Sequence, residues 1–194
     1  MAADFDILIV GAGPSGCSCA LTLKKQGLKV AMIDKELFPR TKTCGDSIPN
    51  AAFRAIEYLN PEWGEQLMSF SDGQPIRKTV VFGSNGYKFN NSWELFSYNC
   101  KRVDFDNFLL NLVRKETEVE CIENQAIKRI ESLEGGVKCH TERGEIINAK
   151  IIVGCDGCHS IVNKEMNPPR VRQKNNGAAF AVTAYVSDID GLVR

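Results

Sequence analysis

The amino-acid sequence predicts an α/β fold with a parallel sheet, helices and a β-meander, joined to a partial β-rich domain. Residues 5–10 (FDILIV) are a short apolar run that stops at glycine, as strands buried on both faces do. A helix-forming segment and a second apolar run at 28–33 follow, which together make a β-α-β unit. From residue 78 onward the apolar residues alternate with polar ones, which favours further strands.

The other elements follow in order along the chain. Ser47 is the expected N-cap of a helix with Pro49 in its first turn. Asn85 and Gly86 predict a hairpin turn. The predicted helices are 17–26, 48–59 and 103–115, and the predicted strands are 5–10, 28–33, 79–82, 87–89, 93–98, 118–122, 126–133, 136–141, 145–149 and 150–153. A basic stretch at 165–176 precedes a last apolar run at 178–186, which we expect to be a strand.

The composition is that of an ordinary globular chain. The 194 residues are 43% hydrophobic and 25% charged, which excludes collagen-like, low-complexity and disordered classes. Lys and Arg number 24, as do Asp and Glu, so net charge gives no reason to bind nucleic acid or an anionic membrane. No segment approaches the roughly 20 apolar residues of a membrane span, and the acidic start is unlike a signal peptide. We expect a cytoplasmic protein that binds no nucleic acid; peripheral membrane contact stays open.

The strongest functional signal is the G-x-G-x-x-G turn between the first strand and the first helix. Gly11 permits the tight turn, Gly13 lets the backbone approach a pyrophosphate, and Gly16 lets the helix pack on the sheet. The N–H groups at the start of the helix offer partial positive charge to phosphates. Pro14 and Ser15 complete the loop and belong to the predicted cofactor site.

An acidic residue ends the second strand, where a dinucleotide site needs one. Asp34 is expected to accept hydrogen bonds from both hydroxyls of an adenosine ribose, and Lys35 follows it in the site. A carboxylate there repels a 2′-phosphate, so FAD or NAD fits better than NADP. The alternative is a glycine turn in an unrelated α/β fold.

Three further segments resemble motifs of one enzyme family. They are 40–47 (RTKTCGDS), similar to a P-x-x-K-x-C-G loop; 102–106 (RVDFD), similar to an arginine followed by F-D at a helix start; and 154–160 (GCDGCHS), similar to G-A-D-G-x-x-S. The family is the FAD-dependent oxidoreductases of the p-hydroxybenzoate hydroxylase fold. Within it, the chain most resembles the geranylgeranyl reductase group, whose relatives include tryptophan halogenases.

The resemblance implies a domain organisation. A Rossmann-like FAD-binding domain would comprise residues 1–70 and 102–165. Residues 71–101 would be a β-rich part of the substrate domain, and 166–194 the start of the return to it. The family carries a further G-D segment that contacts FAD, which this sequence lacks, so we expect the chain to be the N-terminal part of a longer flavoenzyme. On that view the chain alone would bind FAD weakly and self-associate.

The resemblance also assigns roles near the phosphates and the adenine. Arg102 would lie near the FAD phosphates, and Ala126 would offer backbone groups to the adenine. Asp156 would lie near the pyrophosphate; as an alternative compatible with this, it caps the helix that follows.

Cys44, Gly45 and Ser47 would line the ribityl chain and isoalloxazine of FAD in this family. The residue types agree, because Gly45 allows close backbone approach and Ser47 begins a helix whose N–H groups suit negative charge on a reduced flavin. Direct chemistry by the Cys44 thiol and simple packing on the ring are both open.

Several other residues have two readings each. Arg40 and Lys42 are either anion partners or solvated surface charges. A set of aromatic residues is expected mostly in the sheet core, with part of it a wall for an apolar substrate: Trp63, Phe70, Phe82, Tyr87, Phe89, Trp93, Phe96 and Tyr98. The cysteines at 17, 19, 44, 100, 121, 139, 155 and 158 and the histidines at 140 and 159 show no zinc spacing or catalytic pairing. No metal is expected, and no catalytic residue is assigned.

The predicted function is that of an FAD-binding oxidoreductase. The resemblance implies flavin hydride transfer to a small hydrophobic, isoprenoid-like substrate, with NAD(P)H as the electron donor. The alternatives are a flavin-dependent monooxygenase or halogenase-type enzyme, and an inactive nucleotide-binding fragment.

Overall fold

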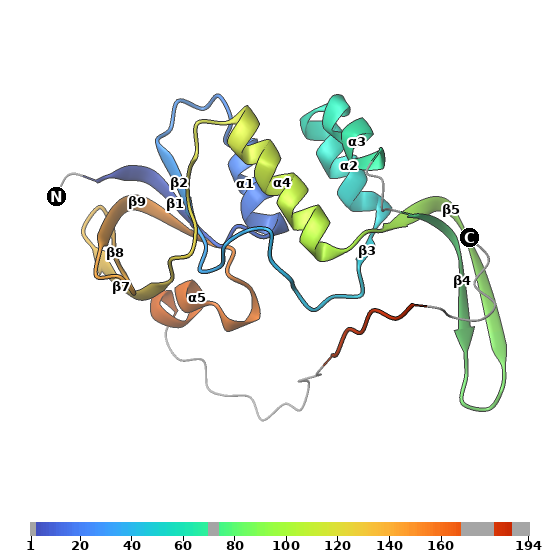
Figure 1. The fold of residues 1–194 in the computed structure, drawn as a ribbon. Coiled ribbons are helices and arrows are strands. Elements are labelled where there is room, and N and C mark those ends of the chain that lie inside the picture. Colours follow the sequence, from blue (N-terminus) through green and yellow to red (C-terminus); the bar gives the residue numbers. More distant parts are fainter. Residues whose placement is uncertain (1–2, 70–73, 168–180, 188–194) are drawn as a thin grey trace.

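Two β-sheets and five α-helices make up the described part of the chain. The computed structural model describes residues 3–69, 74–167 and 181–187. Six strands form the larger sheet in the order β6-β2-β1-β9-β8-β7, and three form the smaller one in the order β3-β5-β4 (Figure 1). The strands of the larger sheet are β1 (Phe5–Val10), β2 (Val30–Ile33), β6 (Glu120–Ile122), β7 (Ile127–Leu133), β8 (Gly136–Thr141) and β9 (Ile146–Gly154).

The larger sheet is parallel on one side and antiparallel on the other. β1 pairs in parallel with β2 and β9, and β2 pairs in parallel with β6. β7, β8 and β9 form the antiparallel β-meander that the sequence predicts. The prediction of two strands at 145–149 and 150–153 is wrong, because β9 is one strand that pairs first with β8 and then with β1.

Both faces of β1 and β2 are buried, which explains their continuous apolar sequences. Ile7, Ile9 and Met32 face the layer of helices α1 (Pro14–Thr22) and α4 (Arg102–Glu116). Leu8 and Ile33 face the opposite side, toward the β-meander and the short helix α5 (Ile161–Met166). The parallel strands therefore have a fixed place in the core, and their carboxyl ends lie at one edge.

Helix α1 differs from its predicted span of 17–26. It begins at Pro14, because proline is favoured in the first turn. It ends at Thr22, and turns follow in which Lys25 adopts a left-handed φ of 67° before Gly27 does the same. The start at Pro14 brings the helix N-terminus into the glycine-rich turn.

The prediction that Ser47 caps a helix is wrong. Ser47–Ile48 form the short strand β3, and helix α2 runs over Asn50–Leu59 with Pro49 as its N-cap. A residue before proline is restricted to extended conformations, which favours strand rather than helix at Ile48. A further helix, α3 (Pro61–Met68), was not predicted; Asn60 caps it by accepting from the Glu62 N–H.

The smaller sheet is a long hairpin with β3 added at its base. β4 (Gln74–Phe82) pairs with β5 (Lys88–Asn99), which confirms the hairpin and its turn at Asn85 and Gly86. The prediction of a separate strand at 93–98 is wrong, because those residues continue β5. The predicted domain boundaries stay a prediction; β3 of the smaller sheet lies within the segment 1–70 that was assigned to the FAD-binding domain.

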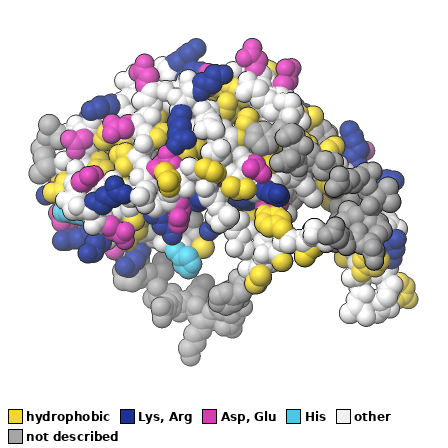
Figure 2. Space-filling view, in the orientation of Figure 1, with side chains coloured by type: hydrophobic (Ala, Val, Ile, Leu, Met, Phe, Trp, Pro, Cys, Tyr) yellow, Lys and Arg dark blue, Asp and Glu magenta, His cyan; other side chains and the backbone are white. Residues whose placement is uncertain are grey.

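The expectation that the aromatic set lies in a sheet core is wrong for the hairpin. Phe82, Tyr87, Phe89 and Trp93 are exposed, since this sheet has no described layer over it. Figure 2 shows hydrophobic side chains at the surface of the projecting hairpin, whereas charges of both signs are mixed over the main body. Trp63 and Tyr98 are buried. Phe70 and the side chain of Phe96 lie outside the described residues.

The expected strand at 178–186 is contradicted where it is described. Residues 181–187 form no helix or strand and are exposed, because no β partner lies beside them in the described chain. Residues 178–180 lie outside the described part, as does most of the basic stretch at 165–176. No helix in the described part is long and apolar enough to cross a membrane.

Candidate functional site

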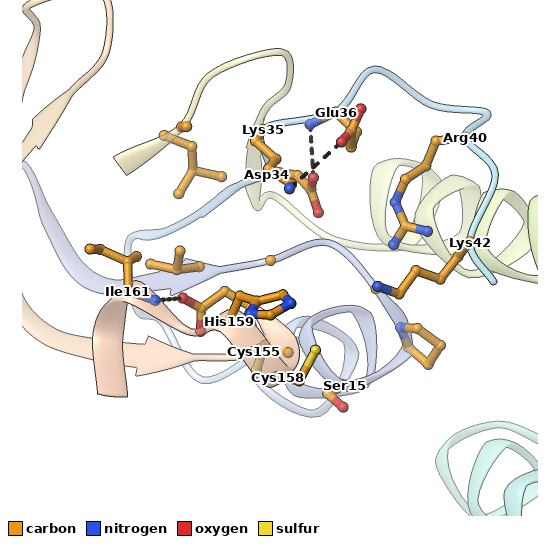
Figure 3. A pocket seen from close by; sticks show the side chains of 18 of the residues that line it. Ser15, Asp34, Lys35, Glu36, Arg40, Lys42, Cys155, Cys158, His159 and Ile161 are labelled. Carbon is orange, nitrogen blue, oxygen red and sulfur yellow. Dashed lines mark hydrogen bonds and ion pairs between the residues drawn. The ribbon is translucent and has the colours of Figure 1, made fainter. Parts of the chain in front are cut away.

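A pocket of about 750 Å³ lies at the carboxyl ends of the parallel strands. Its walls come from the glycine-rich turn, the end of β2, the loop at 40–43, the start of α4, the turn before β7 and the turn after β9 (Figure 3). Ligands of open α/β sheets bind at this edge. Nine predicted site residues line it: Gly11, Gly13, Pro14, Ser15, Asp34, Lys35, Arg102, Ala126 and Asp156.

The three glycines have three different constraints. Gly11 has a φ of 103°, and a Cβ there would lie 2.4 Å from the Cys155 carbonyl oxygen. A Cβ on Gly16 would lie 1.8 Å from the Gly11 carbonyl oxygen, so Gly16 is required for packing and does not line the pocket. A Cβ on Gly13 would meet only the Arg40 guanidinium, at 3.4 Å, so Gly13 leaves space on the pocket side. That space suits a pyrophosphate.

Asp34 is buried and joins the end of β2 to the glycine-rich turn. Its carboxylate accepts from the Ala12 N–H at 2.7 Å and from the Glu36 N–H at 2.9 Å. Each carboxylate oxygen has a second lone pair, so Asp34 can accept further hydrogen bonds from a ligand in the pocket. Lys35 is exposed and lies 3.9 Å from the Glu36 carboxylate at the pocket's rim (Figure 3).

Two arginines share one buried carboxylate beside the pocket. Arg102 binds Asp106 through two hydrogen bonds of 2.7 Å, and Arg40 lies 2.9 Å from the same side chain, which is 0% exposed. The pKa of Arg102 is raised, mainly by these hydrogen bonds and to a smaller extent by Cys44. Two guanidinium groups meet a single carboxyl group, which leaves net positive charge in the wall and suits a phosphate ligand.

Sequence reasoning left Arg40 open and did not single out Asp106. The reading of Arg40 as a solvated charge is wrong, because its side chain is only 14% exposed. Lys42 is exposed but points into the pocket (Figure 3). The signal for Asp106 was its position four residues after Arg102, on the same face of a helix. The pairing with Arg40 depends on tertiary structure and has no local signal.

The far end of the pocket is built by the turn before β7. Gln125 is buried, and its side-chain amide donates to Thr141 and Glu145. Its backbone N–H donates to the Asp34 carbonyl at 3.0 Å, which holds the turn beside β2. Ala126 also lines the pocket, and its carbonyl accepts from the Glu142 N–H; its contact with the adenine stays a prediction. Sequence reasoning missed the anchoring role of Gln125.

Asp156 lines the pocket and also caps α5. Its carboxylate accepts from the Ser160 hydroxyl at 2.5 Å and from the Ile161 N–H at 2.6 Å. The capping alternative is therefore present in the structure. Because Asp156 also faces the pocket, the predicted place near a pyrophosphate stays a prediction.

The predicted flavin-lining residues lie outside this pocket. Cys44, Gly45 and Ser47 follow directly after the wall at 40–43 but do not line it. The helix N-terminus expected at Ser47 is absent, because Ser47 pairs with Asn99 in β3 and β5. The role of all three against the flavin stays a prediction.

The described residues contain no cluster of three or more His, Cys, Asp and Glu that could hold a metal ion. His140 lies 3.0 Å from the Glu131 carboxylate, away from the pocket. His159 and Cys158 lie exposed at the rim of the pocket. Burial raises the pKa of the Cys155 thiol, which disfavours its reactive thiolate form.

Comparison with known proteins shows that the chain is similar to FAD-dependent proteins. Residues 6–72 match the family model described as FAD dependent oxidoreductase. The chain is 27% identical over 175 residues to an uncharacterised protein of Methanosarcina barkeri. It is 28% identical over 173 residues to the FAD-dependent monooxygenase paxM of Penicillium paxilli. Each match covers 84% of this chain, and 40% and 35% of the respective relative.

A solved structure has the same fold. A mutant of the halogenase PltM in complex with FAD matches with a TM-score of 0.70 at 19% identity, over 82% of this chain and 36% of that one. This confirms the predicted α/β fold class. The chain spans well under half the length of these proteins. The matched family model is one of FAD-dependent oxidoreductases, and paxM is an FAD-dependent monooxygenase.

Proposed function

We propose that this chain binds the adenosine diphosphate half of FAD in the pocket and is the FAD-binding part of an oxidoreductase. One observation carries the proposal. Gly13, with no side chain on the pocket side, faces a net positive wall made by Arg40 and Arg102, and Asp34 lies at the end of the neighbouring strand. This is the arrangement that a pyrophosphate next to an adenosine ribose requires.

Different residues of the pocket would contact different parts of FAD. The N–H groups in the first turn of α1, among them that of Ser15, would face the phosphates together with the two arginines. Asp34 would hold the ribose hydroxyls, and the turn at Ala126 would contact the adenine. When bound, FAD supplies two-electron redox chemistry through its isoalloxazine ring.

Within this class we propose a monooxygenase- or halogenase-type enzyme acting on a small hydrophobic substrate. This is supported by two relatives that match most of the chain, the monooxygenase paxM and a 1H-pyrrole-2-carbonyl-[peptidyl-carrier protein] brominase of Pseudoalteromonas luteoviolacea. The second candidate is a reductase of an isoprenoid-like substrate, of the geranylgeranyl reductase type. It is favoured by the loop at 40–47, whose C-G sequence resembles that group. NAD(P)H as electron donor, a cytoplasmic location and peripheral membrane contact belong to the same proposal.

Ligand selectivity tests the binding proposal directly. The purified chain is titrated with FAD, ADP and FMN by calorimetry. We expect FAD and ADP to bind and to compete for one site, and FMN, which has no adenosine, to bind at least about a hundredfold more weakly. Binding of FMN as tight as that of FAD, or no binding of ADP, would overturn the proposal.

Oxygen dependence distinguishes the two candidate reactions. The protein is loaded with FAD, and its flavin is reduced. The reduced protein is then mixed with an apolar alkene or an aromatic substrate, in the presence and in the absence of oxygen. The first candidate requires oxygen for product formation. The second forms a saturated product without oxygen, and that result would replace the first candidate.

A further inference from the structure

The segment at 181–187 lies against the loop that leads into β3, although it forms no regular structure. Figure 1 shows it in red below that loop, far from it in sequence. Thr183 and Tyr185 make side-chain hydrogen bonds to residues 44–46. An exposed irregular segment with three specific hydrogen bonds to one loop requires an explanation beyond chance contact.

The hydroxyl of Thr183 bonds to both backbone groups of Cys44. It donates to the Cys44 carbonyl at 2.8 Å and accepts from the Cys44 N–H at 3.3 Å. A hydroxyl group is both a donor and an acceptor, so serine can replace threonine here but valine cannot. Cys44 therefore has its backbone fixed by a side chain from the other end of the chain.

Asp46 is the second point of attachment. Its carboxylate accepts from the Tyr185 hydroxyl at 2.5 Å and from the Arg102 N–H at 3.2 Å, and its carbonyl accepts from the Cys100 N–H. Asp46 has a φ of 55°, a left-handed conformation that costs free energy in residues other than glycine. These hydrogen bonds stabilise that conformation. The bond to Asp46 also raises the pKa of Tyr185.

The fixed loop joins the wall of the pocket to the arginine pair. Residues 40–43 line the pocket and run directly into residues 44–46, where the Asp46 carboxylate accepts from the Arg102 N–H at 3.2 Å. Lys101, the residue before α4, lies with its ammonium 5.6 Å from the centre of the Tyr185 ring. The segment at 181–187 therefore contacts the loop at 44–46 on one side of Arg102 and Lys101, the residue before Arg102, on the other.

We propose that Thr183 and Tyr185 are positioning residues that hold residues 44–46 against Arg102 and so fix the wall of the pocket at 40–43. Neither residue lines the pocket. The proposal rests on the proposed function only where it concerns FAD.

Alkylation of Cys44 tests the positioning without any ligand. The rate at which a maleimide labels each cysteine is followed by mass spectrometry in the wild-type chain and in Tyr185→Phe, Thr183→Val, Thr183→Ser and Val182→Ala. We expect Cys44 to be labelled about three- to tenfold faster in Tyr185→Phe and Thr183→Val, because each loses hydrogen bonds that oppose local opening. Thr183→Ser and the exposed control Val182→Ala should match the wild type.

Buried Cys17 is an internal reference in the same experiment. It is 0% exposed in the core, so faster labelling of Cys17 would report global unfolding. Equal Cys44 rates in all five proteins would overturn the proposal. Faster labelling of Cys44 and Cys17 to the same extent would also overturn it, because the effect would then be general destabilisation.

Titration with FAD tests the second half of the proposal. We expect Tyr185→Phe and Thr183→Val to bind FAD several-fold more weakly and Thr183→Ser to be normal. Unchanged FAD affinity in variants with faster Cys44 labelling would contradict the link to the pocket wall. A wild-type chain that does not bind FAD would instead contradict the proposed function, and the labelling result would stand independently.

Discussion

Asp106 is the shared partner that holds the two arginines of the pocket wall in place. Its carboxylate is fully buried and is held by Arg40 and Arg102 from two separate segments of the chain. A buried ion pair adds little free energy by itself, but its disruption leaves uncompensated charge. The loop at 40–43 and the start of α4 are therefore linked through one side chain.

Replacement of Asp106 by alanine should destabilise the protein strongly. We expect the free energy of unfolding to fall by about 3 kcal/mol, because two partly buried guanidinium groups lose their counter-ion. Urea denaturation measures this loss. Asp104→Ala, in the first turn of the same helix, is the matched control and should cost at most about 1 kcal/mol. Equal losses in both variants would show that the Asp106 pairs have no special role.

Asp34 has both a structural role and a predicted binding role, which one substitution can separate. Asp34→Asn keeps the shape but has one acceptor oxygen instead of two. We expect FAD to bind about ten- to a hundredfold more weakly, because hydrogen bonds to the ribose are lost. Glu36→Gln, on the same pocket wall, should change the affinity little. If thermal stability falls and FAD affinity is unchanged, the predicted binding role is contradicted. Asp34 would then act only through its hydrogen bonds to the Ala12 and Glu36 N–H groups.

Burial of Cys139 predicts a loss of stability at high pH. Desolvation raises the pKa of this thiol from 9.0 to about 11. The unfolded chain therefore loses this proton at lower pH than the folded one, and the free energy of unfolding falls as pH rises from about 9 to 11. The loss from this group is on the order of 2 kcal/mol. Denaturation at pH 8 and pH 11 should show a smaller fall in Cys139→Val; an identical fall in both proteins would rule the group out.

At the scale of elements, the hairpin β4–β5 carries a set of exposed apolar side chains on one face. Strand alternation places Val81, Tyr87, Phe89 and Trp93 on one face, and all four side chains are more than half exposed. The Trp93 indole N–H donates to the Thr79 hydroxyl on this face. Exposed apolar surface of this kind promotes association between molecules.

Polar substitutions on this face should reduce self-association. We expect the double variant Tyr87→Ser, Phe89→Ser to remain monomeric at concentrations where the wild-type chain associates, as measured by analytical ultracentrifugation. Phe82→Ser, on the opposite face and 72% exposed, is the control and should associate as the wild type does. If all three proteins associate to the same extent, the apolar face is not the cause.

The comparison of elements shows where sequence patterns are sufficient. The turn at Asn85 and Gly86 and the apolar stripe of α4 are local signals, and both predictions are confirmed. The two-residue strand β3 has no detectable period, and α3 is short and contains Gly64, so neither pattern was recognised. Local propensity determines long elements, whereas short ones depend on their partners in the folded chain.

The same distinction applies to the candidate site. The glycine-rich turn and Asp34 were predictable, because each belongs to a motif whose spacing follows from backbone geometry. The sharing of Asp106 by Arg40 and Arg102 was not, because it joins a loop to a distant helix. The contacts of Thr183 and Tyr185 with residues 44–46 were hidden for the same reason.

At the scale of the whole molecule, the pocket is assembled by the larger sheet. β1, β2 and β9 end at its floor, and the segments that follow them provide the glycine-rich turn, Asp34 and Asp156. The smaller sheet lies apart from this pocket and is joined to it through α4 and the loop at 40–47. Relatives are more than twice as long as the chain, so activity and substrate remain proposals, while FAD binding can be tested on this chain.

The most direct test of this account is FAD titration of Gly13→Val beside the wild-type chain. Gly13 has an extended backbone, with φ of −72° and ψ of −175°, which valine can adopt. A Cβ there would meet only the end of the Arg40 side chain, at 3.4 Å, so the protein should stay folded. Its side chain would occupy the space assigned to the pyrophosphate. Thr22→Val, at the other end of α1, is the control. We expect a loss of FAD affinity of about a hundredfold or more in Gly13→Val alone; normal FAD affinity in a folded Gly13→Val protein would contradict the central claim.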